Sequence, residues 1–282
     1  MKTSEAEALL KSLELTKDRV KLAKNTTEEE LQKLLIDDKN KPVRDGLLIN
    51  RNLTSEVIQK IVEKTRSSEA IRILTTKPML SEETITYILE NKKLTEEDLF
   101  YIIPNMTKKA TLPQLIKMMN QYPLFSYAVI NSNNFPIHDY EKYVDINNPQ
   151  HLGGLASSPK ITEEIFDKII NSPITEYYTY NHKKLTPIIF SLIVNRNLTY
   201  EMLIKLAPRI KETTHHIFLS TQPKMDETIW KLYLKNMDNP SKISLITEQY
   251  VSTQLLEILS KDSSRKVRNE ANQKLQTRPI IN

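Results

Sequence analysis

Lysines recur at one position of a repeated sequence pattern, and their spacing is the feature that most directly suggests chemistry. The lysines six residues after a predicted helix start are Lys33, Lys60, Lys117, Lys168 and Lys205, with Lys142 and Lys231 close to the same register. On helices stacked about 8 to 10 Å apart, their ammonium groups would form a positive stripe suited to phosphate groups. Alternatively, these lysines complete pairs with a glutamate four residues earlier, and the stripe is largely neutralised; the pairs are Glu29 with Lys33, Glu56 with Lys60, Glu164 with Lys168, Glu201 with Lys205 and Glu227 with Lys231. We favour pairing and keep polyanion binding at Lys117 and Lys142 as the alternative.

Aromatic and cationic residues gather in the segment 171–184, which accounts for a step between helix starts that is about ten residues longer than usual. The cluster contains Tyr177, Tyr178, Tyr180, His182, Lys183 and Lys184. Aromatic rings beside cations can stack on nucleic-acid bases, and tyrosine is also enriched at the energetic centres of protein interfaces. A solvated loop that binds nothing is the third interpretation. Because insertions in repeat proteins form loops and loops often bind partners, we predict partner binding at this cluster.

Positive charge with little compensation lies near the C-terminal end of the sequence. Arg265, Lys266 and Arg268 occur in the segment 261–282, whose acidic residues are Asp262 and Glu270. These three residues are further predicted polyanion contacts. The formal net charge of +5 is modest and the isoelectric point is near 9.0, so nucleic acid stays an alternative partner.

Catalytic and metal chemistry finds little support in the sequence. The chain has no cysteine, which excludes a thiol nucleophile and a thiolate metal site. Its five histidines show no metal-ligand spacing, and the adjacent His215 and His216 would point in different directions on a helix. Phosphate-binding glycine loops and Gly-x-Ser-x-Gly motifs are missing as well. We therefore predict no enzymatic activity, no catalytic residue, no cofactor and no metal.

An internal repeat indicates the elements that position these residues. The stretch 195–201 (Asn-Arg-Asn-Leu-Thr-Tyr-Glu) matches 50–56 (Asn-Arg-Asn-Leu-Thr-Ser-Glu) at every position but one. The hydroxyl of the threonine can cap a helix, and the glutamate places negative charge at the positive end of the helix dipole. The predicted helix starts are Thr27, Thr54, Ser81, Thr111, roughly Ile137, Thr162, Thr199, Asp226 and Ser252.

The spacing of these helix starts predicts the architecture. Thr27, Thr54 and Ser81 are 27 residues apart, as are Thr199 and Asp226, and this length holds two short helices and two turns. Apolar runs upstream of the starts, such as 187–194, supply the second and more buried helix of each pair. We predict an all-α fold, a right-handed α-solenoid of about nine to ten helical hairpins with a period near 27 residues.

The segments 43–44 (Val-Arg), 50–52 (Asn-Arg-Asn) and 54–56 (Thr-Ser-Glu) resemble the units of HEAT-like and leucine-rich-repeat-variant α-helical repeat proteins, and 267–268 repeats the Val-Arg. The resemblance extends over nearly the whole chain and implies a solenoid, but it specifies no activity. The four cysteines of some leucine-rich-repeat-variant proteins are absent, so it implies no iron–sulfur cluster. Some HEAT-like solenoids are DNA glycosylases, which makes that enzyme class a distant third functional alternative.

The repeats organise residues 1–282 as a single predicted domain. Its parts are an N-terminal capping helix (1–15), regular repeats (16–121), irregular repeats with the insertion loop (122–184), regular repeats (185–260) and a C-terminal capping half repeat (261–282). With no long apolar run, no signal peptide and no cysteine, the sequence predicts a cytoplasmic protein without membrane contact. The rich Lys, Asn and Ile content is typical of AT-rich coding in some bacteria and phages.

These features together predict an interaction scaffold without catalysis. We expect a protein partner, bound through the solenoid surface and the irregular segment 122–184, where Gly153 and Gly154 would let another chain approach the backbone closely. Nucleic-acid binding, DNA or RNA, through lysine and arginine stripes is the alternative function.

Overall fold

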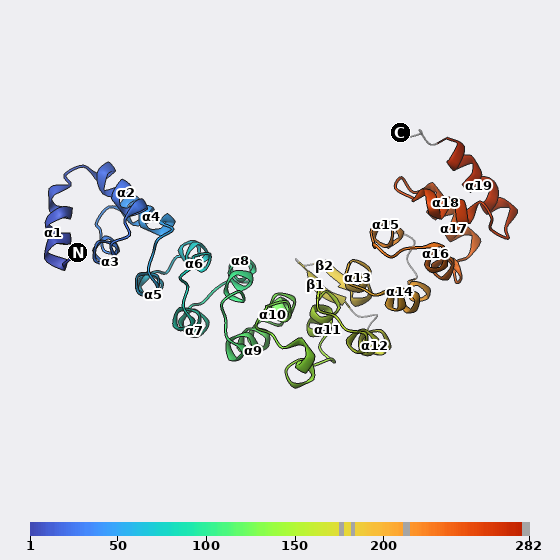
Figure 1. Ribbon diagram of the computed structural model, residues 1–282, viewed down its shortest axis with the longest axis horizontal. Helices are drawn as coiled ribbons and strands as arrows, with labels where there is room; N and C mark the ends of the chain where they lie inside the picture. Colours follow the sequence, from blue (N-terminus) through green and yellow to red (C-terminus); the bar gives the residue numbers. More distant parts are fainter. Residues whose placement is uncertain (175–177, 182–183, 211–214, 278–282) are drawn as a thin grey trace. The chain divides into compact units, whose positions relative to one another are not determined.

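The computed structural model describes residues 1–174, 178–181, 184–210 and 215–277, and these are predominantly α-helical (Figure 1). This confirms the prediction of an all-α fold class, with one short two-stranded hairpin among the described residues as the exception. The chain divides into two compact units, residues 1–135 and 136–282. None of the helices in the described ranges is long and apolar enough to cross a bilayer.

The helices of the first unit lie in two rows (Figure 1). The even row consists of α2 (Thr16–Asn25), α4 (Lys41–Ile49), α6 (Ser68–Thr75), α8 (Glu96–Met106) and α10 (Ser126–Ile130), with the 3-10 helix η1 (Pro123–Phe125) before α10. The odd row consists of α1 (Thr3–Ser12), α3 (Glu29–Leu35), α5 (Ser55–Lys64), α7 (Glu82–Asn91) and α9 (Leu112–Gln121). Each helix contacts the next helix of its own row.

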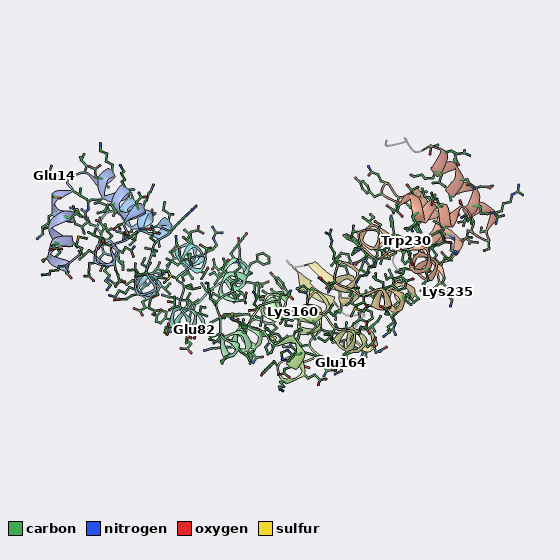
Figure 2. All side chains as sticks on the ribbon, in the orientation of Figure 1. Glu14, Glu82, Lys160, Glu164, Trp230 and Lys235 are labelled. Carbon is green, nitrogen blue, oxygen red and sulfur yellow. The ribbon has the colours of Figure 1, made fainter. Side chains whose placement is uncertain are left out.

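The second unit is built from similar helical pairs. Its helices are α11 (Pro149–Ala156), α12 (Glu163–Asn171), α13 (Ile188–Ile193), α14 (Tyr200–Leu206), α15 (His216–Leu219), α16 (Glu227–Leu234), α17 (Asn239–Thr247), α18 (Thr253–Leu259) and α19 (Arg265–Gln276), with the 3-10 helices η2 (Ile137–Lys142) and η3 (Ala207–Arg209). Helix α11 contacts α12 and α13, and α14 contacts α12 and α16. Trp230 of α16, which is labelled in Figure 2, is buried in the core, and its indole N–H donates to Gln254 Oε1 at 3.1 Å.

The exception to the helical pattern is an antiparallel hairpin within the predicted insertion. Strand β1 (Tyr178–Asn181) pairs with β2 (Lys184–Pro187), Tyr178 opposite Pro187, and β1 contacts α11. The regular helices resume at Ile188, three residues later than the predicted boundary at Leu185. In the same region Gly153 and Gly154 lie buried within α11, so the expectation that they admit another chain is wrong.

Most of the predicted helix starts are N-caps in the structure. The side chains that accept a hydrogen bond from the backbone N–H three residues later are Thr54, Ser81, Thr162, Thr199, Asp226 and Ser252, and Thr111 is the N-cap of α9. Two predicted starts are wrong. Helix α3 begins one residue later than expected, with Glu28 as its N-cap, and Ile137 begins a 3-10 helix rather than an α-helix.

The first asparagine of each Asn-Arg-Asn segment joins neighbouring helical pairs. Asn50 Nδ2 donates to the carbonyl oxygens of Ala23 at 2.8 Å and Thr26 at 2.9 Å, at the end of α2. Asn195 forms the same pair of bonds to the end of α11, at 2.8 and 2.9 Å. Lys77 takes the place of the asparagine in the next pair, and its Nζ donates to Asn50 O at 2.8 Å. These side chains satisfy carbonyl groups that a helix end leaves without a partner.

Candidate functional site

The predicted lysine column in the first unit is neutralised by carboxylates. Lys33 lies 2.6 Å from Glu29 and 2.9 Å from Glu56, so it bridges α3 and α5. Lys60 also pairs with Glu56, at 2.7 Å. Hydrogen bonds from Lys60 and Lys33 lower the pKa of Glu56 to about 2, which keeps this carboxylate charged. The structure therefore confirms ion pairing at these lysines.

The predicted polyanion contacts Lys117 and Lys142 are paired as well. Lys117 Nζ lies 2.8 Å from the carboxylate of Glu90, which is 27 residues earlier on α7. Lys142 lies 3.2 Å from Asp139. Pairing continues elsewhere in the second unit, where Lys168 contacts Glu141 and Glu164, Lys205 contacts Asp167 and Lys231 contacts Glu227. The column therefore does not present free positive charge.

The basic C-terminal cluster has two kinds of residues. Arg268 Nη1 donates to the carbonyl oxygens of Asp262 at 2.6 Å and Ser263 at 2.8 Å, so it holds the turn before α19. Arg44, the other arginine of a Val-Arg segment, donates to Asp38 O in the same arrangement. Arg265 and Lys266, by contrast, are exposed in the first turn of α19. Within the described ranges they form no ion pair.

The predicted tyrosine and lysine cluster falls largely where the structure gives no side-chain positions. Tyr177, His182 and Lys183 lie outside the described residues. The backbones of Tyr178, Tyr180 and Lys184 belong to β1 and β2. Partner binding at this cluster stays a prediction.

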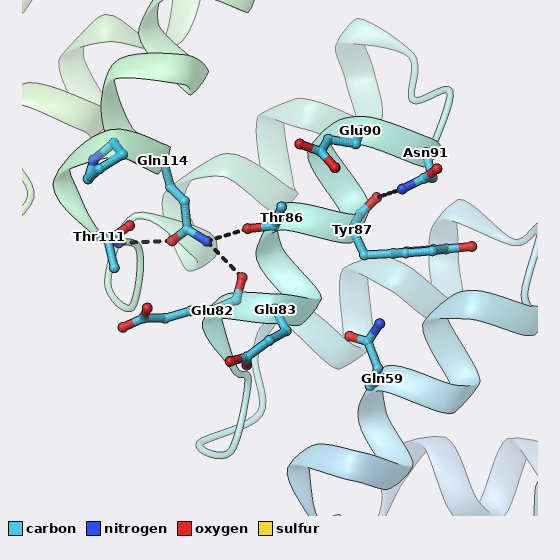
Figure 3. Close-up of a pocket in the computed structure, with 10 residues that line it drawn as sticks. Gln59, Glu82, Glu83, Thr86, Tyr87, Glu90, Asn91, Thr111 and Gln114 are labelled. Atoms are coloured by element: carbon cyan, nitrogen blue, oxygen red, sulfur yellow. Dashed lines mark hydrogen bonds between the residues drawn. The ribbon is translucent and has the colours of Figure 1, made fainter.

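A shallow groove of about 530 Å³ crosses the odd row between α5, α7 and α9 (Figure 3). It is lined by Gln59, Glu82, Glu83, Thr86, Tyr87, Glu90, Asn91, Thr111, Pro113 and Gln114. Gln114 crosses its floor, since its Nε2 donates to Glu82 O at 2.7 Å and to Thr86 Oγ1 at 2.8 Å. The carboxylate of Glu82 projects away from the even row (Figure 2). Hydrogen bonds from its own backbone N–H and from Ser81 lower the pKa of Glu83.

The carboxylates that line the groove, Glu82, Glu83 and Glu90, all belong to α7, and Glu90 is engaged by Lys117. Across the described parts of both units, no three histidine, aspartate or glutamate side chains are grouped so that they could hold a metal ion. The polar contacts of Gln114 instead fasten α9 to α7, which is a structural role.

An exposed aromatic patch lies on the even row and was missed by the sequence analysis. We define the α8–α10 patch as Phe100 and Tyr101 of α8 together with Arg72 and Tyr127, which belong to the two helices that contact α8 in this row, α6 and α10. The guanidinium of Arg72 lies 4.9 Å from the centre of the Tyr101 ring, and the Phe100 and Tyr101 rings meet edge to face at 5.7 Å. Tyr101 is 49% exposed and Tyr127 is 39% exposed. Partial burial raises the pKa of the Tyr127 hydroxyl.

A second surface missed by the sequence analysis is the α2 lysine stripe, defined as Lys17, Lys21 and Lys24. All three side chains are exposed, and within the described part of the chain they form no ion pair. The signal was present in the sequence, because spacings of four and three residues place them on one side of a helix. Helix α2 begins at none of the predicted helix starts, so the repeat pattern does not mark these lysines.

The sequence matches none of the protein-family models, and no curated protein is significantly similar to it.

Proposed function

We propose that this protein is a non-enzymatic scaffold of HEAT-like helical repeats, a right-handed α-solenoid with a period near 27 residues, that binds a protein partner. The period is supported by contacts between neighbouring helical pairs that join residues 27 apart. Examples are Lys77 to Asn50, Lys64 to Asp37 and Lys117 to Glu90. The absence of cysteine favours a cytoplasmic location.

The observation that carries the proposal is the α8–α10 patch. Tyrosine and arginine are enriched at the energetic centres of protein interfaces, and here two exposed tyrosines and a half-buried arginine lie on neighbouring helices of one row. The contact between Arg72 and Tyr101 holds both side chains in place before a partner arrives, which reduces the entropy lost on binding. The neutralised lysine column weakens the alternative of nucleic-acid binding through that surface.

Partner capture tests the proposal. The full chain is immobilised and exposed to a lysate of its source cells, with and without nuclease treatment, and captured proteins are identified and purified for affinity measurement. We expect a partner that survives nuclease, and we expect the double variant Tyr101→Ala with Tyr127→Ala to bind it at least tenfold more weakly, since each hot-spot truncation costs about 2 kcal/mol or more.

Tyr250→Ala is the matched control, because Tyr250 is 66% exposed and belongs to the other unit. Its affinity should stay within twofold of the wild-type value. Loss of the captured partner on nuclease treatment would contradict the proposal, as would equal weakening by the control variant.

A further inference from the structure

The α2 lysine stripe differs from the other lysine groups of the first unit in its surroundings. Lys33, Lys60 and Lys117 on the odd row each have a carboxylate within 2.9 Å. Within the described residues the ammonium groups of the stripe have no such partner. Asp18 is the acidic residue of α2 itself. Asp38, an acidic residue that α2 does contact, is already paired with Arg19 of that helix. The stripe is therefore a local excess of positive charge facing solvent.

The geometry of the stripe fits an elongated acidic ligand. Lys17 and Lys24 are seven residues apart, which is about 10 Å along an α-helix, with Lys21 between them. Carboxylates three or four residues apart on a helix are separated by about 4.5 to 6 Å along its axis, as neighbouring lysines of the stripe are, and carboxylates on alternate residues of an extended chain by about 6 to 7 Å. A segment of two turns or of several extended residues could thus meet all three ammonium groups.

Exposed aliphatic side chains border the stripe. Lys24 runs beside α4, with its Cγ 3.5 Å from the position that a Cβ on Gly46 would occupy. Ile49, one turn further along α4, is 51% exposed, and Leu15, which precedes α2, is 54% exposed. A ligand of this surface can therefore bury apolar groups in addition to neutralising charge.

The composition of the surrounding sequence distinguishes between two kinds of anionic ligand. No aromatic residue occurs before Tyr87, so the part of the chain around α2 has no ring on which a nucleic-acid base could stack. A phosphate backbone also offers nothing aliphatic to cover Leu15 and Ile49. An acidic peptide that carries leucine, isoleucine or valine satisfies both the charge and the apolar border.

We propose that the α2 lysine stripe, with Leu15 and Ile49 beside it, binds an acidic segment rich in aliphatic residues on the protein partner. This inference rests on the proposed function only in taking the partner to be a protein. The stripe supplies electrostatic attraction, which accelerates association and selects acidic partners. Because exposed charges are screened by salt, the interaction weakens as ionic strength rises.

The test uses a fluorescent synthetic peptide of alternating blocks of glutamate and leucine, with a fluorescent DNA duplex and a single-stranded oligonucleotide as competing probes. Anisotropy is measured on the full chain at low and high salt. We expect the peptide to bind at low salt and to be weakened at least tenfold by Lys17→Glu, Lys21→Glu and Lys24→Glu together. The triple variant Lys11→Glu, Lys93→Glu and Lys109→Glu is the matched control, since it changes net charge equally at exposed lysines of the same unit.

Three results would overturn the inference. They are failure of the peptide to bind at low salt, equal weakening by both triple variants, and tighter binding of a nucleic-acid probe that the stripe variant abolishes. Circular dichroism of both triple variants should match the wild-type spectrum, because the Arg19 to Asp38 pair is untouched. If the stripe inference fails while Tyr101→Ala with Tyr127→Ala still loses the captured partner, the proposed function stands without it. If the peptide binds the α2 lysine stripe as expected but nuclease treatment removes the captured partner, the proposed function is contradicted and the stripe inference is not.

Discussion

Removal of the Asn50 side chain should destabilise the first unit far more than its size suggests. Asn50 is fully buried and makes two hydrogen bonds to the end of α2, and its Oδ1 accepts the backbone N–H of Asn52 at 2.8 Å. Asn50→Ala removes all three bonds and leaves the Ala23 and Thr26 carbonyls without this donor. At about 0.5 to 1.5 kcal/mol for each bond, with an added penalty for buried groups left unsatisfied, the expected loss is about 2 to 4 kcal/mol.

Urea denaturation followed by circular dichroism measures this loss. For a slope of about 2 kcal/mol per M, the midpoint of the transition that reports the first unit should fall by about 1 to 2 M. Asn52→Ala is the control from the same motif, because Asn52 is exposed and should change stability by no more than about 0.5 kcal/mol. Asn195→Ala should reproduce the effect in the second unit. A change below about 0.5 kcal/mol for Asn50→Ala, or an equal change for Asn52→Ala, would refute the reasoning.

Two further predictions concern the same contacts between neighbouring helical pairs, which we call joints. Gly46→Ala should lower the free energy of unfolding of the first unit by about 1 kcal/mol in urea denaturation. Alanine favours helices, but its Cβ would lie 3.2 Å from Val20 O, and overpacking costs about 1 to 3 kcal/mol. A variant more stable than the wild-type protein would contradict this prediction. Burial, and after it the nearby Arg51 charge, lowers the pKa of Lys77 below its ordinary 10.5. Between the folded pKa and 10.5 the unfolded chain therefore binds more protons than the folded chain. The free energy of unfolding should rise as pH increases through this range. Lys77→Gln is the control, because glutamine keeps a hydrogen-bond donor but has no titratable group; Gln222 likewise donates to Asn195 O at 3.1 Å. The free energy of unfolding of the wild-type protein should rise with alkaline pH relative to that of Lys77→Gln. Parallel pH profiles of the two proteins would exclude this prediction.

The sequence predicted the helical elements well because their signals are local. A hydroxyl or carboxylate that caps the first turn acts over three residues, and the apolar residues of α5 follow within two turns of the cap. The errors at Thr27 and Ile137 have local causes too. The N-cap of α3 is Glu28, one residue after the predicted Thr27. Around Ile137 the chain forms a 3-10 helix that no capping motif distinguishes from an α-helix.

Features that depend on distant residues could not be read from local patterns. The partner of Lys117 is Glu90, 27 residues earlier, and an i,i+4 rule does not find it. Tyr101 and Arg72 come from different helices, so neither the cation–π contact nor the α8–α10 patch has a sequence signature. The hairpin β1–β2 lies in a segment that was predicted only to be an insertion loop. Short strands without a turn motif carry weak sequence signals, so the hairpin was not predicted.

Several of the residues that carry the resemblance to HEAT-like repeats are not available for binding. Asn50 and Asn195 are buried against preceding helix ends, and Arg44 and Arg268 donate to backbone carbonyls of the turns before their own helices. Their side chains are already used to join one helical pair to the next. The proposed binding therefore uses positions that contacts between helical pairs do not require. In the first unit those positions include Tyr101, Tyr127 and the α2 lysine stripe, which is why both experiments on binding change these residues and leave the joints intact.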